Sequence, residues 1–577
     1  MDRRRFLQAA GAAPAIMVAA PGIVEATGTE PFIDARQLAS RNTNRSTVAC
    51  QNGIVCASQP LAAMAGIDIL KAGGNCIDAA ICVNAMLGLT EPHMNGIGGD
   101  LFAIIWSERE RRLYGLNASG RAPYEWNLAK AADRGLDRIP MRSPLAWTVP
   151  GCVSGWGMLS NRFGKLNMAR CLEPAIEYAD AGFPLSPIIA RAFNWGGGRT
   201  NSDSSLASVY RPDGHVPKFG EIFKNPQLAH SYRLIAEDGP AAFYQGEIAQ
   251  RIVAKSTELG GAMSLRDLAE HSANWVDPVG TDYRGFDVWE LPPNGQGMTV
   301  LQMLNLLEHF DIGEMELNSA EQLHLLVEAK KLAFEDRARY YADPDFAAVP
   351  VDRLISKEYA AERVKLIDPL HASRDVRPGD PELDSDTIYM TAADNEGNMI
   401  SLIQSLYSSF GSRICPDGVG FPMQNRGQGF SLDPRHANRL EAHKRPFHTI
   451  IPAFVTEAGR PLLSFGVMGG AFQPQGHCQV LMNMLDFALS PQQAGDQPRV
   501  LHTGSSDPAA GRRRAPGTLF FERGIHDAVK LKLGEMGHQL GNQAGAMGGY
   551  QAIWRTDDPR VYFGGSDPRK DGGAIGY

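Results

Sequence analysis

A threonine at the start of a predicted strand is the residue best placed for nucleophilic chemistry. Thr387 opens the strand-like run 387–393 and directly follows residues 368–386, which hold three prolines and no apolar periodicity. A threonine hydroxyl needs a neighbouring base to act as a nucleophile near neutral pH. If the bond between Asp386 and Thr387 breaks, the freed α-amine, with a reference pKa of about 7.7–8.0, can be that base. Threonine is also an ordinary strand former, so this position alone leaves both roles open.

The elements around Thr387 are predicted to be two β-hairpins in a scaffold of helices. Strand-like runs at 387–393 and 399–406 flank a turn at 394–398, and runs at 101–106 and 113–117 flank a charged turn. Apolar residues at helical spacing predict four helices, over residues 58–75, 78–89, 319–341 and about 474–487. With no internal repeat and no compositional break, the 577 residues predict an α/β protein of one large or two closely packed units.

The N-terminal residues indicate an export signal. Arg3-Arg4-Arg5-Phe6-Leu7 precedes an apolar run at 9–23, and small residues precede a cleavage point expected after Ala26. An arginine pair followed by Phe-Leu is typical of twin-arginine export. The alternative, a basic start before an ordinary first helix, is disfavoured because that helix would be rich in Ala, Gly and Pro and would lack caps. We therefore expect residues 1–26 to be a twin-arginine signal peptide and the mature protein to be periplasmic or secreted.

Composition and spacing exclude several classes of protein. A pI of about 6.0 and scattered Lys and Arg argue against nucleic-acid binding, and no later stretch has the roughly 18 uninterrupted apolar residues of a membrane span. The eight cysteines show no CxxC spacing, and neither an HExxH motif nor a Cys/His cluster is present. We therefore predict buried structural thiols, no metal, no other cofactor and a small-molecule substrate.

Many ordered motifs resemble one enzyme family, the gamma-glutamyltransferase family of N-terminal-nucleophile hydrolases. The resemblance covers nearly the whole mature chain, and Asp386-Thr387 and the hairpin that follows resemble the family's self-cleavage site. The other matching segments lie at 53–58, 72–79, 96–100, 149–151, 292–297, 336–339, 410–411 and 469–470. The resemblance implies a four-layer αββα sandwich built jointly by a large fragment, residues 27–386, and a small fragment, residues 387–577. Each fragment is then the other's partner after cleavage.

The resemblance also implies roles for individual residues. Thr387 becomes the nucleophile of both self-cleavage and substrate attack, and Ser405 becomes the nearby hydroxyl residue that assists maturation. An outward-facing strand serine is the alternative for Ser405. The amides of Gly469 and Gly470, just before a predicted helix, are expected to face the developing oxyanion. A simple flexible turn is the alternative for that pair.

The predicted substrate pocket departs from the family pattern. The family arginine that grips an α-carboxylate falls at Ser119, with Arg121 two residues later as a possible substitute. The family asparagine that helps hold the α-amino acid end is Tyr407 here. The aspartate expected to bind the α-amine falls at Gly429, within a segment that begins Asn425-Arg426.

The altered pocket is predicted to contain positive charges and no carboxylate. The family serine pair beside the acyl group is His448-Thr449 here, and Arg426 adds another positive charge, although His448 could equally be a packing residue. Arg426, Arg121 and His448 together favour an acyl group that bears an acid and no amine. That pattern resembles the cephalosporin-acylase-like and oxamate-hydrolase-like branch.

The function predicted from the sequence is a self-processing threonine-nucleophile amidohydrolase or acyltransferase acting on amides of small acidic acyl groups. The short segment 432–443, where many transferases carry a longer lid, favours hydrolysis because water can reach the site. The enzyme alternative is a conventional gamma-glutamyltransferase that hydrolyses glutathione. The alternative from another class is a periplasmic solute-binding protein without catalysis. No GxSxG motif supports a serine hydrolase.

Overall fold

The computed structural model describes most of the chain. The described residues are 45–195, 204–211, 214–373, 386–509, 517–542 and 547–577. The predicted signal peptide at 1–26 and residues 374–385 of the proline-containing segment lie outside these ranges. In the described residues, no helix is both long and apolar enough to cross a membrane.

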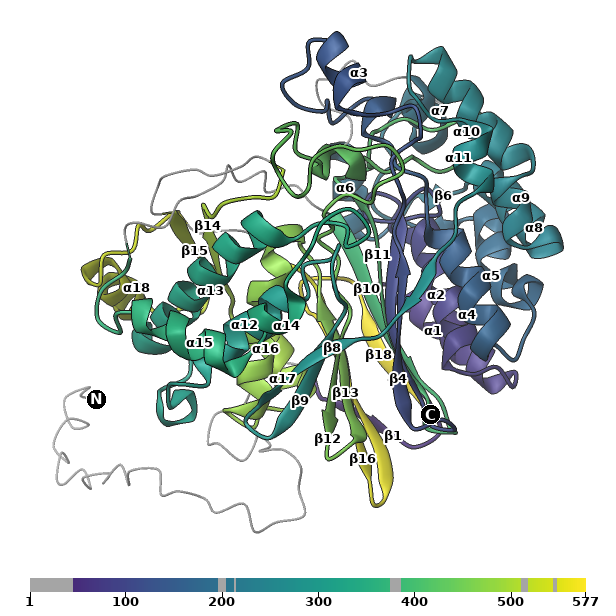
Figure 1. Cartoon of the computed structure of the whole chain (residues 1–577). Coiled ribbons are helices and arrows are strands. Elements are labelled where there is room, and N and C mark those ends of the chain that lie inside the picture. Colours follow the sequence, from purple (N-terminus) through teal and green to yellow (C-terminus); the bar gives the residue numbers. More distant parts are fainter. Residues whose placement is uncertain (1–44, 196–203, 212–213, 374–385, 510–516, 543–546) are drawn as a thin grey trace, which may run out of the picture.

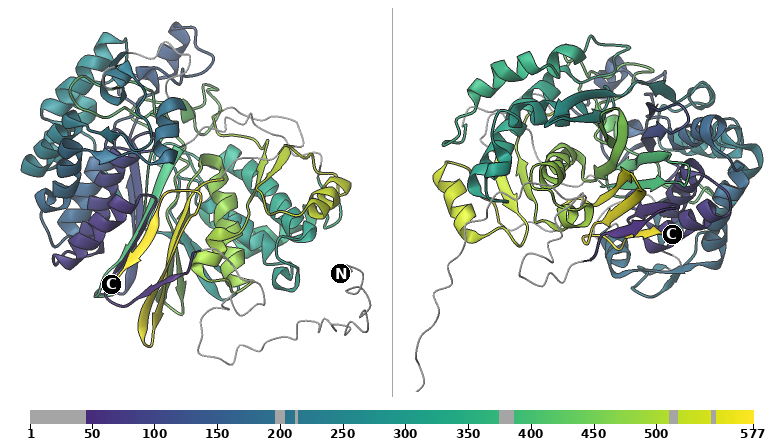
Figure 2. Two further views of the ribbon diagram at one scale, coloured as in Figure 1. Left: turned by 180° about the vertical axis from the view of Figure 1, so that it is seen from behind. Right: turned by 90° about the horizontal axis from the view of Figure 1, so that it is seen from below.

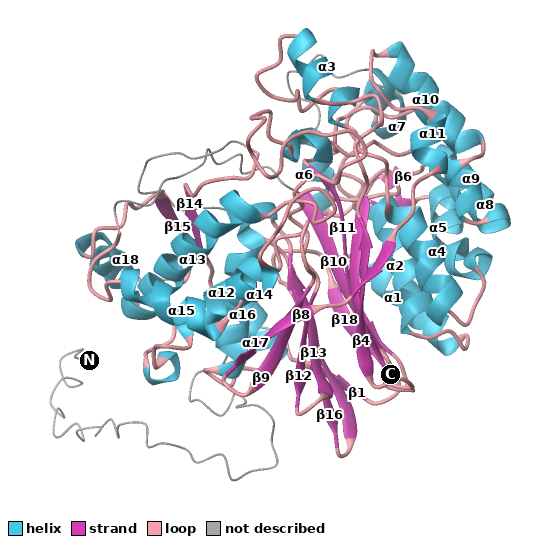
Figure 3. Ribbon diagram, in the orientation of Figure 1, coloured by secondary structure: helices cyan, strands magenta, loops and turns pink. Residues whose placement is uncertain are grey.

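Two seven-stranded antiparallel sheets form the centre of the molecule (Figure 3). The strand order of the first sheet is β18 (Gly573–Gly576), β2 (Ile54–Ala57), β10 (Asp386–Ala393), β11 (Met399–Tyr407), β3 (Asp100–Ser107), β4 (Arg112–Ala118) and β7 (Asn274–Val276). The order of the second sheet is β1 (Val48–Cys50), β17 (Arg560–Ser566), β16 (Tyr550–Asp557), β13 (Arg460–Val467), β12 (Ala453–Glu457), β9 (Phe286–Glu290) and β8 (Val279–Tyr283). The hydroxyls of Thr391 and Ser464 are hydrogen-bonded between the sheets at 2.6 Å.

Helices cover the outer face of each sheet (Figures 1 and 2). The first sheet is covered by α1 (Pro60–Lys71), α2 (Cys76–Thr90) and α4 (Cys152–Phe163); outside them α5 (Met168–Ala181) packs against α2, and α8 (Pro226–Asp238) packs against α5. The second is covered by α12 (Met298–Leu307), α16 (Gln473–Leu485) and α17 (Pro491–Asp496), and α13 (Ala320–Tyr340) packs against α12 and α16. The predicted αββα sandwich is therefore confirmed.

Shorter elements complete the fold around these four layers. The helices are α3 (Leu128–Asp133), α6 (Pro187–Trp195), α7 (Ser204–Tyr210), α9 (Pro240–Tyr244), α10 (Glu247–Glu258), α11 (Leu265–Ala269), α14 (Val351–Leu354), α15 (Lys357–Arg363) and α18 (Asp527–Glu535). Two small sheets pair β5 (Phe183–Pro184) with β6 (Ile222–Phe223), and β14 (Val500–Thr503) with β15 (Thr518–Phe521).

Strands from both sides of the Asp386–Thr387 bond alternate within each sheet. In the first sheet β10 pairs with β2 on one edge and β11 pairs with β3 on the other, so strands that follow residue 386 lie between strands that precede it. In the second sheet β12 pairs with β9 in the same way. Neither segment can form a complete sheet alone, so a cut at this bond would leave two interlocked fragments.

Helix α2 shows how the local sequence fixes an element that supports the site. Its N-cap, Asn75, accepts hydrogen bonds from the backbone of Ile77 and Asp78, while the Asp78 carboxylate accepts one from Asn75 N–H. This capping box starts the helix two residues before the predicted position 78. Every residue of α2 is buried, which explains its apolar sequence all round.

Four buried histidines and the partly buried His271 predict loss of stability in acid. Burial is the main cause that lowers the pKa of His93, His271, His477 and His538 from 6.5 to about 3, and that of His448 to about 4. Below about pH 6.5 these histidines take up protons in the unfolded chain but not in the folded chain. Their contribution to the free energy of unfolding is therefore fully present above that pH and falls below it. Each histidine that is protonated only in the unfolded chain adds a slope of about 1.4 kcal/mol per pH unit to the free energy of unfolding. We expect the thermal midpoint to fall steeply between about pH 6.5 and pH 4; a flat profile across that window would contradict this account.

Candidate active site

Thr387 lies at a break in the regular pairing of β10 with β11. Asp386 pairs with Tyr407 and Ile388 pairs with Gln404, so Ser405 and Leu406 together face the single residue Thr387. Such a β-bulge turns side chains away from their usual alternation. Thr387 is buried, and its hydroxyl donates to Ser405 Oγ at 3.3 Å. The two hydroxyl residues predicted to act in maturation are thus in contact.

Three donors from the described residues converge on the Ser405 hydroxyl oxygen. Besides Thr387, they are the backbone N–H of Tyr407 at 2.8 Å and Nη2 of Arg426 at 3.3 Å. Tyr407 has a φ of +78°, a conformation that is rare for a non-glycine residue. Strain of this kind clusters at functional sites because the surrounding structure must hold it. Ser405 Oγ is therefore fixed beside Thr387 rather than exposed on the strand.

Arg426 is a fully buried cation beside this pair. Its Nη1 donates to Thr449 Oγ1 at 2.9 Å, and its guanidinium lies 4.2 Å from the centre of the Tyr407 ring. Burial lowers the pKa of Arg426 to about 10, with Tyr407 and Asp100 acting in the opposite direction, so it stays charged at neutral pH. Within the described ranges no carboxylate is ion-paired with it, and its Nε has no acceptor. A buried guanidinium without a counter-charge is suited to binding an anionic group.

Two other predicted pocket residues already have protein partners. His448 Nε2 contacts Asp100 Oδ2 at 3.1 Å, and His448 Nδ1 accepts from Ile450 N–H at 3.3 Å, with the histidine and aspartate side chains fully buried. This bonding is that of a packing histidine, the alternative that the sequence left open. Arg121 is paired with Asp343 at 3.4 Å and Asp345 at 3.1 Å. Of the three predicted cations, it is Arg426 that donates to Ser405, the residue in contact with Thr387.

The turn at Gly469 and Gly470 lies at the same end of the sandwich as Thr387. Gly466, near the end of β13, packs against the ring of Tyr389, two residues after Thr387. Gly469 and Gly470 have φ values of +119° and +52°, which glycine adopts without strain. No acceptor among the described residues is hydrogen-bonded to either amide. The turn leads through a short 3-10 segment, residues 470–472, into α16.

Asn425 and Gly429 flank Arg426 and shape its loop. The Asn425 side chain accepts from Ser408 N–H and donates to Ser408 Oγ, both at 3.1 Å, which ties this loop to the chain that follows β11. Asn425 is thus a support for the loop in this structure. A Cβ placed on Gly429 would lie 3.2 Å from the carbonyl oxygen of Phe447. The position can hold a side chain only after a small shift of its neighbours.

One polar cluster was missed because its members are far apart in sequence. His324 and Glu328 of α13 lie close to His538, and their potential ligand atoms all lie within 4.8 Å of one another. The two imidazoles contact at 2.8 Å, and Lys331 is paired with Glu328 at 2.7 Å. A divalent ion would have to compete with that lysine for the one carboxylate, so the donor set fits a metal poorly. The cluster instead fastens the chain at Asp368 and Ser373 by hydrogen bonds to their backbone.

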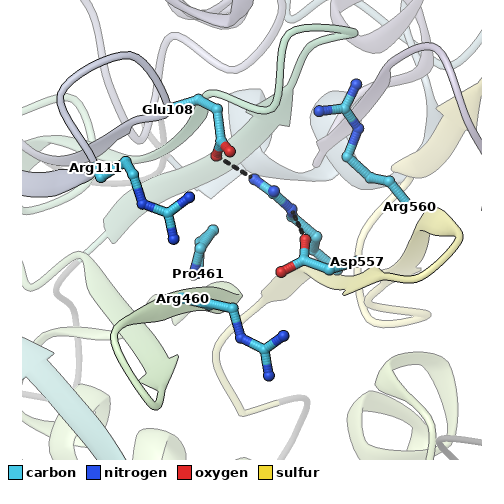
Figure 4. A pocket seen from close by; sticks show the side chains of 7 residues that line it. Glu108, Arg111, Arg460, Pro461, Asp557 and Arg560 are labelled. Carbon is cyan, nitrogen blue, oxygen red and sulfur yellow. Dashed lines mark hydrogen bonds and ion pairs between the residues drawn. The ribbon is translucent and has the colours of Figure 1, made fainter.

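The surface cavity in Figure 4 is separate from this site. Its volume is about 220 Å³, and it lies where the hairpin turns of both sheets meet, at the opposite end of β10 and β11 from Thr387 and Ser405. It is lined by Glu108, Arg111, Arg460, Pro461, Arg555, Asp557 and Arg560. Arg555 there is paired with both Glu108 and Asp557 at 2.8 Å.

The cysteines fit the structural role predicted for them. All eight are free thiols, and seven are buried, with Cys50 partly exposed. Burial raises the pKa of Cys82 and Cys56 well above its usual value, which disfavours the reactive thiolate.

The four-layer fold is that of N-terminal-nucleophile hydrolases, and comparison with known proteins defines the family. A sequence profile described as gamma-glutamyltranspeptidase matches residues 62–577, and the chain belongs to that family of hydrolases and acyltransferases. It is 39% identical over 538 residues to the glutathione hydrolase-like YwrD proenzyme of Bacillus subtilis, covering 92% of this chain and all of that protein. It is 32% identical to the oxamate amidohydrolase proenzyme of Klebsiella pneumoniae, covering 91% and 98% of the two chains. A cephalosporin acylase from Bacillus halodurans superposes with a TM-score of 0.85 at 39% identity, covering 93% and 98%.

Proposed function

We propose that this chain is a self-processing amidohydrolase whose nucleophile is Thr387 and whose substrates are amides of small acidic acyl groups without an α-amine. The observation that carries the proposal is the environment of Arg426. This buried cation has no carboxylate partner in the described chain, and it donates to the Ser405 hydroxyl, which is hydrogen-bonded to Thr387. A carboxylate on the acyl group would supply the missing counter-charge.

Maturation is proposed to begin with attack of the Thr387 hydroxyl on the carbonyl carbon of Asp386. The amide bond becomes an ester, the amine of Thr387 is released, and water then cleaves the ester to leave a free carboxylate on Asp386. Ser405, in contact with the attacking hydroxyl at 3.3 Å, orients it. The fragments are residues 27–386 and 387–577 if the signal peptide is removed after Ala26.

Catalysis then uses the new α-amine as the base. The amine takes the hydroxyl proton as Thr387 Oγ1 attacks the substrate carbonyl, and the amides of Gly469 and Gly470 stabilise the oxyanion. The proton passes to the leaving amine, and water releases the acid from the acyl-enzyme. A second amine in place of water would give acyl transfer.

A gamma-glutamyl substrate fits this pocket less well. Its α-ammonium needs an acceptor or a negative charge, and neither Tyr407 nor Gly429 supplies a carboxylate. Asp100 is occupied by His448, by the backbone N–H groups of Gly120 and Gly151, and by Gln424. Membership of an enzyme family sets aside the solute-binding alternative. Export by the twin-arginine route remains a prediction from residues 1–26.

The test is the ratio of kcat/KM for glutaryl and gamma-glutamyl anilides, with oxalyl anilide as a second acidic acyl donor. Leaving a buried ammonium without a partner costs roughly 1–3 kcal/mol or more, which predicts at least a several-fold preference for the glutaryl compound. Gly429→Asp should narrow or reverse that ratio, while Gly429→Ala, which adds only the tight Cβ, should not. A wild-type preference of about tenfold or more for the gamma-glutamyl donor would favour the conventional activity instead.

A further inference from the structure

Two sequence motifs without an assigned role meet behind the candidate active site. Residues 292–297 lie just before α12, and residues 336–339 form the last turn of α13. Gln296 and Arg337, one from each motif, are buried and in contact, with Arg337 Nη1 donating to Gln296 Oε1 at 2.6 Å. Both motifs therefore contribute to one polar network in the core.

The Gln296 amide holds two segments of the candidate site at once. Its Nε2 donates to the carbonyl oxygen of Thr449 at 2.6 Å and to that of Gly470 at 2.8 Å. Thr449 bears the hydroxyl that accepts from Arg426, and Gly470 belongs to the proposed oxyanion turn. One side chain thus sets the distance between the anion-binding side and the oxyanion side of the pocket.

Arg337 fixes which way the Gln296 amide points. A guanidinium can only donate, so the oxygen of the amide must face it and the nitrogen must face the two carbonyls. Arg337 itself is held by the ring of Phe334, 3.8 Å from its guanidinium carbon, and its Nη2 lies 3.9 Å from Asp507. An amide without that neighbour could turn over and place its oxygen against two carbonyl oxygens.

Asn294 anchors the same segment on its other side. Its side-chain Nδ2 donates to the carbonyl oxygen of Pro446 at 2.7 Å, and its backbone carbonyl oxygen accepts from His448 N–H at 2.9 Å. The chain from Pro446 to Thr449 is therefore tied to residues 294–296 at three points. A shift of Gln296 would be transmitted directly to Thr449 and Gly470.

We propose that Gln296 is a positioning residue that sets the relative placement of Arg426 and the oxyanion turn, and that Arg337 acts through it by orienting its amide. The inference rests on the proposed function, because it assigns Gln296 to the same pocket. Neither residue is assigned contact with the reacting atoms. They affect turnover by holding the groups of the pocket in place. Misplacement of such groups by about 1 Å costs on the order of 100-fold in rate.

The test compares Gln296→Met with a matched control, Gln302→Met. Gln302 is also a buried glutamine, on α12; its Nε2 donates to Asp336 at 2.9 Å and its Oε1 accepts from Tyr341 at 2.7 Å, and in the described part of the chain it has no hydrogen bond to the pocket residues. We expect both variants to lose similar thermal stability. Gln296→Met alone should lose about 10- to 100-fold in kcat, with a smaller change in KM, while Gln302→Met keeps kcat within about twofold.

Arg337 is tested through its coupling to Gln296. Arg337→Met should lower kcat, Arg337→Lys should restore part of it because a donor remains, and the double variant Gln296→Met/Arg337→Met should be no slower than the slower single variant. If Gln296→Met does not fold, Gln296→Glu takes its place, since a carboxylate keeps the bond to Arg337 but cannot donate to the two carbonyls.

The outcomes separate this inference from the proposed function. An active wild type in which Gln296 and Gln302 variants lose kcat equally, or in which the Gln296 and Arg337 effects simply add, overturns the positioning role and leaves the proposed function intact. A wild type that is neither cut before Thr387 nor active on the anilides overturns both. Selective loss of kcat in the Gln296 variants supports both.

Discussion

Thr387→Ala is expected to remain a single chain and to show no amide hydrolysis. Both self-cleavage and turnover use the same hydroxyl, and the substitution removes it while leaving the strand and its buried position intact. Wild type should separate into two bands on a denaturing gel, and the variant should give one. Since removing a catalytic nucleophile typically costs on the order of a million-fold, residual turnover should lie below detection.

The control for this substitution is Thr391→Ala. Thr391 lies on the same strand, is equally buried and is bonded to Ser464 between the sheets, but it is four residues away from the cleavage point. Its alanine variant should lose stability and still cleave itself. A Thr387→Ala protein that is cut at the same bond would show that another group is the nucleophile.

Arg426→Met is expected to lose most activity on glutaryl anilide and little on a neutral acyl anilide of similar length. Removing one member of a buried, hydrogen-bonded charge pair costs about 2–5 kcal/mol, which converts to a loss of roughly 30- to several thousand-fold in kcat/KM. The neutral substrate has no carboxylate to leave unpaired, so its kcat/KM should change far less. The measurement is made on processed protein with both substrates in parallel.

The neutral substrate also separates two roles of Arg426. The guanidinium donates to Ser405 as well as to Thr449, so its loss could disturb the nucleophile instead of substrate binding. Equal losses on the charged and neutral substrates would assign Arg426 to the nucleophile and remove the main support for an acidic acyl group. Arg426→Lys should recover only part of the selectivity, because a single ammonium cannot make the forked contact.

The sequence predicted the fold better than it predicted the contacts of the pocket residues, and Thr387 as nucleophile stays a prediction. Hairpin and helix patterns are local, and so β10, β11, α13 and α16 were found with ends shifted by one or two residues. Pocket residues depend on long-range pairing that a linear pattern does not contain. Arg121 was expected to be available, but Asp343 and Asp345, more than 200 positions away, are paired with it.

Buried polar contacts account for most of what sequence reasoning missed. The packing role of His448 depends on contacts with Asp100 and Ile450, which occupy both ring nitrogens and leave no signal in the local sequence. Gln296 and Arg337 carry no distinctive signal, since a single glutamine or arginine is most often a surface residue. Their presence within motifs shared with the family was the available hint.

The most direct test of the account is mass spectrometry of the small fragment after rapid acid quenching of a reaction with glutaryl anilide. The account predicts a fragment whose first residue is Thr387 and a transient form heavier by one glutaryl group, with the added mass located on that residue by fragmentation. A fragment beginning at another residue, or an acyl group carried by a different side chain, would contradict it.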